Sequence, residues 1–588
     1  MRNLFLLCLF LLAPAVHGGN MAEQAATLFD SDWQWQLEHR PELATSIGDY
    51  RFDATLSATS LAASRAGTAQ ARKVLDEARA IDRDKLTPAQ QLSLDLFIYD
   101  KEQQLRAAAL YPYMVQPLSA YAGIHVTLPQ LVAQMPFATE ADYRKYIARL
   151  SALPQHVDGL IEQLREGMRS GWTAPALVMR PLPAMLRQLR EHAVDGALGQ
   201  PLRQIPATID KPVREALVAA GTVALRTRVL PALQTLEDFI RTEYLPAARE
   251  SIAASALPGG REYYAQLVAL NTETAMTPAE VHALGLKEVA RLKGELGAAI
   301  ARTGFAGTFP EFAAFANSDK RLFYDNAEAL LERYRRIVAR SSASLPRLFD
   351  AAPAQELLVK AAPALGAQER GAAWYDAGGA DRPAAFVVNT SRLDMRPMWE
   401  METLALHEAL PGHHLQVALA REQAGLPAFR RYAWYGAYGE GWAQYAESLG
   451  PELGLFRDPF SAFGRLNAEL FRAARLVVDT GIHALGWNRQ QALDYLNANT
   501  ANGLADNALE VDRYIAWPAQ ALGYQVGALK IRALREQAQA ALGERFEIRR
   551  FHAALLRQGA LPLALLEQEI ARWIDEEMRR QVTAAIKQ

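Results

Sequence analysis

The sequence predicts a mostly α-helical protein with one small β-sheet, and three observations support this. Long stretches repeat apolar residues at three- and four-residue spacing, the period of an amphipathic helix. Signals for strands are few, and the clearest is the β-branched run AAFVVNT at 384–390. The 588 residues are too many for one small core, so we expect two subdomains or one large helical body.

The clearest helical patterns lie at 89–108, 142–168 and 278–304. The last begins at a recognisable cap, because Thr277 precedes Pro278 and Glu280 follows three residues after the threonine.

A break between two helical regions is expected at ASALPGGREYY, 254–264, where Pro-Gly-Gly interrupts the pattern. It divides the chain into a helical N-terminal half, 19–257, and a catalytic half, 258–588, which carries the motifs described below. We expect the two halves to form one unit.

Residues 1–18 have the layout of a secretory signal peptide: Arg2, then the apolar run LFLLCLFLLAPAV, then small residues. The run is shorter than the about 20 apolar residues of a spanning helix, although a retained anchor is the alternative reading. Cys8, the one cysteine, lies inside it. Cleavage of the signal peptide therefore leaves the mature protein without a thiol for a disulfide, a metal site or a nucleophile. A secreted protein without thiols fits an oxidising compartment such as the bacterial periplasm.

The composition excludes some partners. A net charge of −2 gives no basic footprint for nucleic acid. There is no lysine and arginine run for anionic membranes, so no stable membrane insertion is expected after signal removal. Nothing in the sequence indicates an oligomeric state.

HEALPGHHLQ, residues 407–416, resembles an altered zinc-protease motif. In H-E-x-x-H two histidines four residues apart share one helical face and one metal ion. Here a straight helix would turn His413 about 240° away from His407 and place His414 about 10 Å further along the axis. Pro411 and Gly412 supply a break, which would bring a later histidine back to the metal.

A third ligand is available downstream in YGEGWAQYAESLG, 438–450, a predicted helix with Glu440 and Glu447 on one face. A hydrolytic zinc site takes three protein ligands and leaves one position open, and Glu408 would stand beside the metal as the base.

HEALPGHHLQ, EGWAQYAE, FVVNTSRLDMRP and EVDRYIAWPAQALGYQVGALKI together resemble the DUF885 family. These are bacterial, mostly secreted proteins related to the gluzincin metallopeptidases. The resemblance covers nearly all of the mature chain and is strongest at about 370–535. It implies a large helical, gluzincin-like zinc hydrolase with a small sheet edge near the active site.

The resemblance also assigns roles. His407 matches the first metal ligand, Glu408 the general base, and Glu440 the third ligand. Gly412-His413-His414-Leu415 reproduces a Gly-His-x-Leu pattern, which makes His413 the second ligand, with His414 as the alternative. Glu447 then resembles a carboxylate that orients a ligand histidine.

Further residues are expected to act on the substrate. The oxyanion needs a donor, which the resemblance implies is a tyrosine or histidine of the downstream region. We favour Tyr514, with Tyr524 and His483 as alternatives. The tyrosines could equally be core residues. Arg475 and Arg513 are candidates to bind a substrate carboxylate, or to pair with Asp479 or Asp512. Asn389, at the end of the predicted strand, is expected to hold a peptide along the strand edge.

Three functions follow from this reading. The first is a zinc peptidase for short peptides, of carboxypeptidase, dipeptidase or oligopeptidase type, in which Glu408 takes a proton from the attacking water. The second is a zinc amidohydrolase acting on a non-peptide amide or a cell-wall fragment. The third is a non-catalytic binding protein, which would have no need of Glu408.

Overall fold

The structure is a computed structural model that describes residues 20–111, 116–363, 371–379 and 382–586. The predicted signal peptide and Cys8 lie outside the described residues. The fold is mostly α-helical with one three-stranded sheet, as predicted.

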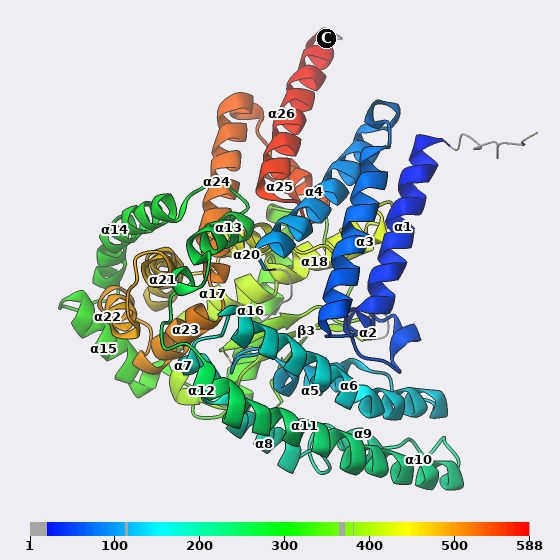
Figure 1. The fold of residues 1–588 in the computed structure, drawn as a ribbon. Helices are drawn as coiled ribbons and strands as arrows, with labels where there is room; N and C mark the ends of the chain where they lie inside the picture. Colours follow the sequence, from blue (N-terminus) through cyan, green and yellow to red (C-terminus); the bar gives the residue numbers. More distant parts are fainter. Residues whose placement is uncertain (1–19, 112–115, 364–370, 380–381, 587–588) are drawn as a thin grey trace, which may run out of the picture.

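The first four helices lie side by side at one side of the molecule (Figure 1). They are α1 (Met21–His39), α2 (Pro41–Ser46), α3 (Leu61–Arg79) and α4 (Pro88–Leu110).

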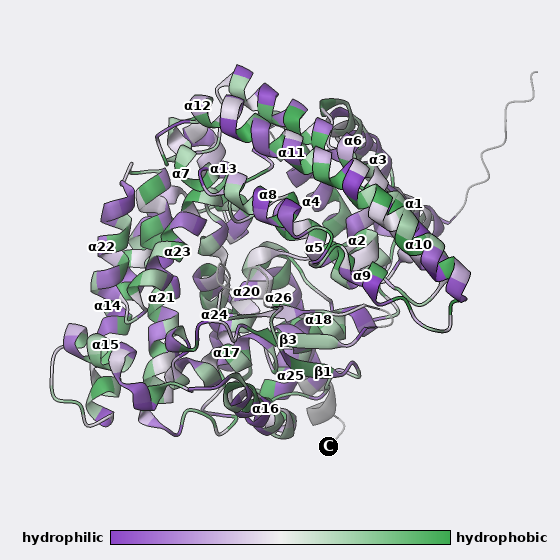
Figure 2. Ribbon diagram, turned by 90° about the horizontal axis from the view of Figure 1, so that it is seen from below, coloured by the Kyte–Doolittle hydropathy of each residue, from purple (hydrophilic) through white to green (hydrophobic). Residues whose placement is uncertain are grey.

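A second group forms the lower edge in Figure 1. Its members are α5 (Ile124–Gln134), α6 (Glu140–Ser170), α7 (Ala176–Met179), α8 (Leu182–Glu191), α9 (Gln200–Arg203), α10 (Lys211–Ala224), α11 (Leu230–Phe239) and α12 (Leu245–Ala247). Two π-helical turns join the last three into one run, Lys211–Ala247. By length and composition alone this run could cross a membrane, but its buried face, which includes Leu233, packs in a hydrophobic core. Hydrophobic and hydrophilic residues alternate along α10 and α11 (Figure 2).

Four further helices lie between α12 and the sheet: α13 (Gly260–Thr272), α14 (Pro278–Arg302), α15 (Phe309–Ser318) and α16 (Ala327–Ser344). The predicted cap of α14 is present, because the Thr277 hydroxyl accepts from the Glu280 N–H while the Glu280 carboxylate accepts from the Thr277 N–H. The three helices predicted most clearly from periodicity correspond to α4, α6 and α14.

The sheet has the order β1-β3-β2. β1 (Leu357–Ala361) is parallel to β3 (Ala384–Val388), and β2 (Ala373–Asp376) is antiparallel to it. The predicted strand is therefore the central one, and every residue of it is buried.

Ten helices complete the chain: α17 (Met401–Glu408), α18 (His413–Glu422), α19 (Ala428–Arg431), α20 (Gly436–Ser448), α21 (Pro459–His483), α22 (Arg489–Asn499), α23 (Leu504–Ala516), α24 (Gly523–Leu542), α25 (Ile548–Leu556) and α26 (Leu563–Ile586). α17, α18 and α20 lie near the centre of the molecule, and α24 runs from there toward the top of the view (Figure 1).

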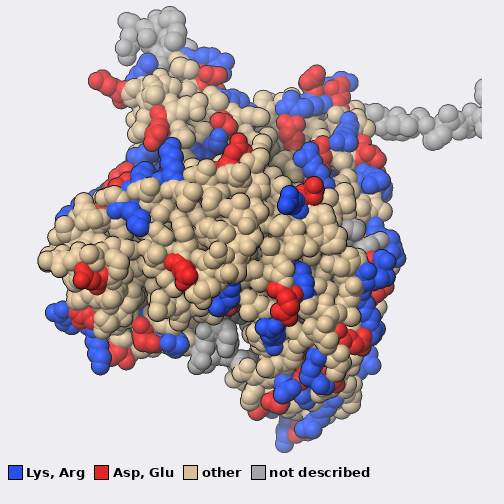
Figure 3. Space-filling view, turned by 60° about the vertical axis from the view of Figure 1, so that its left-hand side comes forward, with Lys and Arg blue, Asp and Glu red and all other residues tan. Residues whose placement is uncertain are grey.

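The two largest hydrophobic cores each contain residues from both predicted halves. Leu233 and Leu470 belong to one core, and Leu94 and Leu534 to the other. The N-terminal helices therefore pack directly against the elements that carry the motifs. On the face shown in Figure 3, positive and negative side chains are interspersed.

Candidate metal centre

The HEALPGHHLQ segment forms two helices with a four-residue interruption. α17 ends at Glu408 and α18 begins at His413. Across the interruption the His414 N–H donates to the Ala409 carbonyl (3.2 Å), one residue further back than in a regular α-helix. The break expected from the sequence is thus present, and it brings the His413 ring within 4.7 Å of the His407 ring, centroid to centroid.

Gly412 is needed at this break because the backbone folds tightly on itself. A Cβ atom there would collide with the carbonyl oxygens of His407 and Leu406. Trp442 of α20 holds the segment from the other side, donating from Nε1 to the Pro411 carbonyl (2.9 Å). The geometry that returns His413 to His407 is therefore fixed by packing.

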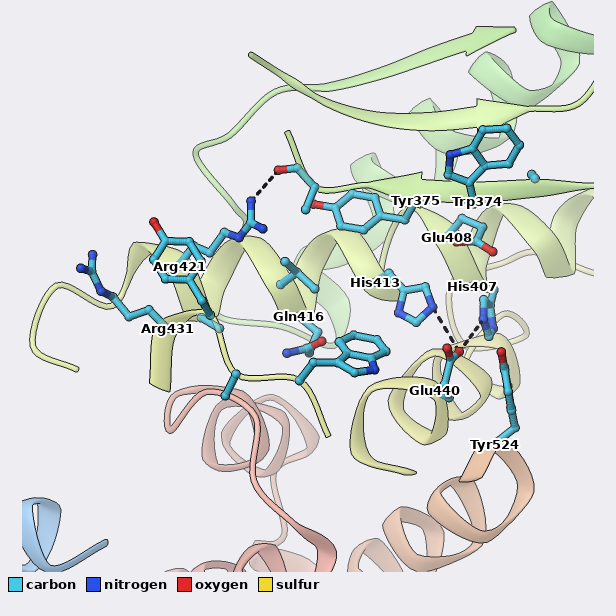
Figure 4. A pocket seen from close by; sticks show the side chains of 17 residues that line it. Trp374, Tyr375, His407, Glu408, His413, Gln416, Arg421, Arg431, Glu440 and Tyr524 are labelled. Atoms are coloured by element: carbon cyan, nitrogen blue, oxygen red, sulfur yellow. Dashed lines mark hydrogen bonds and ion pairs between the residues drawn. The ribbon is translucent and has the colours of Figure 1, made fainter. Parts of the chain in front are cut away.

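Three side chains converge on one point (Figure 4). Glu440 Oε2 lies 3.4 Å from Nε2 of His407 and 3.4 Å from Nε2 of His413. Two ligands held at about 2.1 Å in tetrahedral geometry lie about 3.4 Å apart, so these separations fit a shared zinc ion. Among the described residues Glu440 Oε2 is buried without a hydrogen-bond partner, which a metal ion would supply. Two imidazoles and one carboxylate are also a donor set that zinc accepts in hydrolases.

Glu447 orients the first histidine. His407 donates from Nδ1 to Glu447 Oε1 (2.8 Å), and its Nε2 faces Glu440. Arg472 of α21 lies 2.7 Å from the same Glu447 oxygen. Burial tends to lower the pKa of His407, but Glu440 and Glu447 outweigh it and raise this pKa to about 9. The position of Arg472 could not be predicted from the sequence, because it depends on the packing of α21 against His407 and Glu447.

The two carboxylates of the cluster have opposite shifts. Burial raises the pKa of Glu408, against the opposing charges of His407 and His413 and a hydrogen bond from the Tyr375 backbone. Burial also acts to raise the pKa of Glu440, but the two imidazoles outweigh it and lower that pKa. Glu440 is thus held in its charged form, and the Glu408 carboxylate binds a proton more readily than an exposed glutamate does.

Tyr524 of α24 completes the cluster. Its ring stacks on His407 with centroids 6.2 Å apart, and its hydroxyl points toward Glu440 in Figure 4. α24 can approach α20 closely because Gly441 and Gly527 face each other, where a Cβ atom on either would meet backbone of the opposing helix. Burial raises the pKa of Tyr524 to about 12, so its hydroxyl stays protonated and can donate a hydrogen bond.

Two cavities meet at the cluster and share His407, Glu408 and Tyr524. The first, of about 480 Å³, runs along α18 and is here named the α18 cavity; its lining includes Tyr375, His413, Gln416, Arg421, Arg431 and Trp434. The second, of about 300 Å³, is named the α21 cavity; its lining includes Arg396, Glu400, Arg472, Arg475, Asp506 and Arg513. A substrate could therefore extend to both sides of the cluster.

His414, the alternative second ligand, lies away from the convergence point. Its Nδ1 accepts from the Tyr375 hydroxyl (3.2 Å), and its Nε2 donates to the Gln355 carbonyl (3.2 Å). Burial lowers the pKa of His414 to about 4, so the ring is neutral. The structure brings His413, and not His414, to His407 and Glu440.

Tyr514, the favoured oxyanion donor, does not line either cavity. It donates to Glu510 (2.8 Å) and accepts from Arg475 Nε (3.0 Å). Of the two tyrosines, Tyr524 lies at the cluster, and this corrects the order of preference from the sequence.

Arg475 and Arg513 do line the α21 cavity, but both pair with Glu510. Asp479 and Asp512, the partners considered from the sequence, are engaged elsewhere. Asp479 accepts from Tyr264 and the Ala519 N–H, and Asp512 pairs with Arg489. Both arginines thus pair with a carboxylate of the protein, as the alternative from the sequence expected, but this carboxylate is Glu510.

Two further predicted residues are not brought to the cluster. His483 is buried and accepts from the Ala254 N–H while donating to the Tyr514 carbonyl, both at 3.0 Å. Asn389 is also buried, and its amide donates to the Gly371 carbonyl (3.1 Å). β3 is paired on both edges, so it has no free edge for a peptide. The strand that lines the α18 cavity is β2, an edge strand of the sheet. The roles expected for His483 and Asn389 are corrected accordingly.

A family model described as "Bacterial protein of unknown function (DUF885)" matches residues 41–570. The chain belongs to the DUF885 family. No curated protein matches this DUF885 chain.

Two solved structures are similar over almost the whole chain. One, described as "the putative lipoprotein from Colwellia psychrerythraea", is 28% identical with a TM-score of 0.90, covering 95% of this chain and 100% of that one. The other, described as "a putative lipoprotein of unknown function from Shewanella oneidensis", is 17% identical with a TM-score of 0.67, covering 94% and 99%. The second likeness concerns the fold alone.

Proposed function

We propose that the protein is a zinc-dependent hydrolase of gluzincin type that cleaves peptide bonds in short peptides. The observation that carries this proposal is the convergence of His407, His413 and Glu440 beside Glu408, where two cavities meet. Space on both sides of the cluster suits a substrate that continues on both sides of its scissile bond.

The residues divide the chemistry between them. His407, His413 and Glu440 would hold the zinc ion, which when bound lowers the pKa of a water and polarises a carbonyl. The carboxylate of Glu408 takes the proton from the attacking water and returns it to the leaving amine. The Tyr524 hydroxyl donates to the oxygen on which negative charge develops. The Glu447 carboxylate keeps the proton of His407 on Nδ1.

A location in the cell envelope or outside the cell is part of this proposal. It is supported by the signal-like N-terminus and by two similar structures described as lipoproteins.

The test is mass spectrometry of a mixed peptide library incubated with the purified, zinc-supplemented protein. We expect cleavage by the wild type and a loss of about 10²- to 10⁴-fold in Glu408→Gln, the usual contribution of a general base. Glu536→Gln, an exposed change on α24, is the matched control and should cleave normally. Equal turnover by wild type and Glu408→Gln would refute the mechanism. A folded, zinc-loaded protein that cleaves no peptide would favour the amidohydrolase alternative, with cell-wall fragments as the next substrates.

The two tyrosines give a second test. Tyr524→Phe should lower kcat by about 10²- to 10³-fold if its hydroxyl stabilises the oxyanion. Tyr514→Phe removes a hydroxyl of the same type outside both cavities, and we expect a much smaller change in kcat. The reverse order would restore Tyr514 as the donor.

A further inference from the structure

Two arginines line the α18 cavity at the end away from the metal cluster (Figure 4). Arg421 donates to the backbone carbonyls of Ala377 (2.8 Å) and Gly378 (3.3 Å). Arg431 forms no side-chain hydrogen bond to a described residue, and its Nε is buried without a partner. Within the described part of the chain, neither guanidinium lies within ion-pair distance of a carboxylate.

Both guanidinium groups pack against the same aromatic ring, that of Tyr432, from different sides (Figure 4). The Arg421 and Arg431 carbons lie 5.4 Å and 5.8 Å from the centroid of Tyr432. Trp33 of α1 stacks on the same ring, with centroids 5.7 Å apart and planes 5° apart. Two positive charges thus lie around one ring at this end of the cavity, where both would attract a bound anion.

The nearby carboxylates are already engaged. Asp376 pairs with Arg382 and accepts the Gly378 N–H. Glu422 accepts the backbone N–H groups of Ala354 and Gln355. The protein therefore supplies no counter-ion to Arg421 and Arg431 from these neighbours, although a guanidinium fork is well matched to a carboxylate.

The spacing along α18 connects the arginines to the metal cluster. His413, Gln416, Val417, Ala420 and Arg421 all line the cavity, as residues on one helical face should. Eight residues of helix separate His413 from Arg421 by about 12 Å. Since an extended peptide spans about 3.3 to 3.6 Å per residue and the arginine side chain is itself long, this distance corresponds to about two or three residues.

We propose that Arg421 and Arg431 form a subsite for a substrate carboxylate, located two or three residues from the scissile bond. This rests on the proposed function and adds the substrate class to it: short peptides that carry a negative charge on the α18 side. Two sources have this chemistry, the C-terminal carboxylate of a peptide and the side chain of an aspartate or glutamate.

Two matched pairs of peptides distinguish the sources. In the first pair, a free C-terminus two or three residues after the cleaved bond is replaced by a C-terminal amide. In the second, a glutamate two or three residues before the cleaved bond is replaced by glutamine. We expect wild-type kcat/KM to fall by about 10- to 100-fold within one pair, as for loss of a charged hydrogen-bond partner. The pair that responds identifies the source.

The arginine variants connect this preference to the subsite. Arg431→Gln and Arg421→Gln should each reduce the discrimination within the responding pair while leaving the neutral peptide almost unaffected. Arg431→Gln is the safer variant, because its side chain has no hydrogen bond to lose. Arg336→Gln, an exposed change on α16, is the control and should retain the full preference. Cleavage of both members of both pairs at equal rates, or a preference unchanged in both variants, would overturn the inference.

Binding measurements separate this inference from the proposed function. Isothermal titration calorimetry of Glu408→Gln with the same peptides should show tighter binding of the charged member, dependent on Arg421 and Arg431. If no peptide is cleaved by the wild type but this dependence is found, the peptidase proposal fails and the carboxylate subsite stands. If peptides are cleaved but charged and neutral members bind equally, the subsite fails and the peptidase proposal stands.

Discussion

The two cavities that meet at His407 and Glu408 hold their arginines in different ways. In the α21 cavity three of the four lining arginines are paired: Arg475 and Arg513 share Glu510, and Arg472 pairs with Glu447. The fourth, Arg396, donates to the backbone carbonyls of Asn389 and Met395. In the α18 cavity Arg421 and Arg431 have no carboxylate partner among the described residues.

This difference separates two uses of the same side chain. A paired arginine in a low-dielectric site is part of the architecture, because removing either partner leaves a buried charge uncompensated. An arginine held in place by carbonyls and an aromatic ring remains available to an anionic ligand. We therefore expect substitutions at the arginine pairs of the α21 cavity to lower the stability of the protein. Substitutions of Arg421 and Arg431 in the α18 cavity should lower its selectivity for substrates.

The largest effect should follow from Glu510→Gln. Burial alone would raise the pKa of Glu510, but Arg513 and Arg475 outweigh it and lower this pKa to about 2. Removing the charge leaves two guanidinium groups unpaired, and we expect the free energy of unfolding to fall by about 2 to 4 kcal/mol. Urea denaturation monitored by circular dichroism measures this. A change below about 0.5 kcal/mol would show that the pairs contribute little and would remove the contrast between the cavities.

Glu447→Gln should act mainly on metal affinity. The carboxylate fixes the His407 tautomer and pairs with Arg472, so its loss should weaken zinc binding by about 10- to 100-fold. Competition with a chelator at fixed pH measures the change. Unaltered zinc affinity would mean that His407 is held by packing alone.

Glu400 gives a pH-dependent test inside the α21 cavity. Burial, assisted by Asp506, raises the pKa of Glu400 to about 8, in contrast to Glu510 nearby. Because the folded pKa lies above the unfolded value, the protonated carboxyl stabilises the fold at low pH, and this contribution is lost as the pH rises through 8. Wild-type stability should fall by about 1 kcal/mol more than that of Glu400→Gln between pH 7 and pH 9. Parallel profiles for the two proteins would contradict the shift.

The smallest effect on stability is expected for Arg431→Gln. Its guanidinium has no hydrogen bond or ion pair to any residue that the structure describes, so the free energy of unfolding should change by less than about 0.5 kcal/mol. Urea denaturation in parallel with Glu510→Gln gives the direct comparison. A loss comparable to that of Glu510→Gln would make Arg431 structural and would count against the subsite.

The helices were largely predictable from the sequence because their signals are local. Apolar spacing located α4, α6 and α14, and Thr277 with Glu280 located the start of α14. β3 was visible as a β-branched run, but its partners were not. β1 and β2 are short and partly exposed, and their pairing depends on contacts between segments that the local pattern does not encode.

The residues of the candidate site likewise fall into those that belong to local motifs and those that packing alone brings to the cluster. His407, Glu408, His413, Glu440 and Glu447 lie in two short motifs whose residues and order resemble those of a known family, so the motifs point to them. Regular helix spacing alone would have turned His413 away from His407. For side chains that reach the cluster from distant helices, the order of preference predicted from the sequence was wrong. Tyr514 and Tyr524 have similar surroundings in sequence, and only the packing of α24 against α20 at Gly441 and Gly527 decides which one reaches His407.

The most direct test of the metal centre is zinc content by inductively coupled plasma mass spectrometry, comparing wild type with His413→Ala and His414→Ala, all verified as folded by circular dichroism. We expect one zinc ion per chain in the wild type and in His414→Ala, and a large loss of zinc in His413→Ala. Zinc retained in His413→Ala but lost in His414→Ala would contradict the convergence of His407, His413 and Glu440 on a single ion.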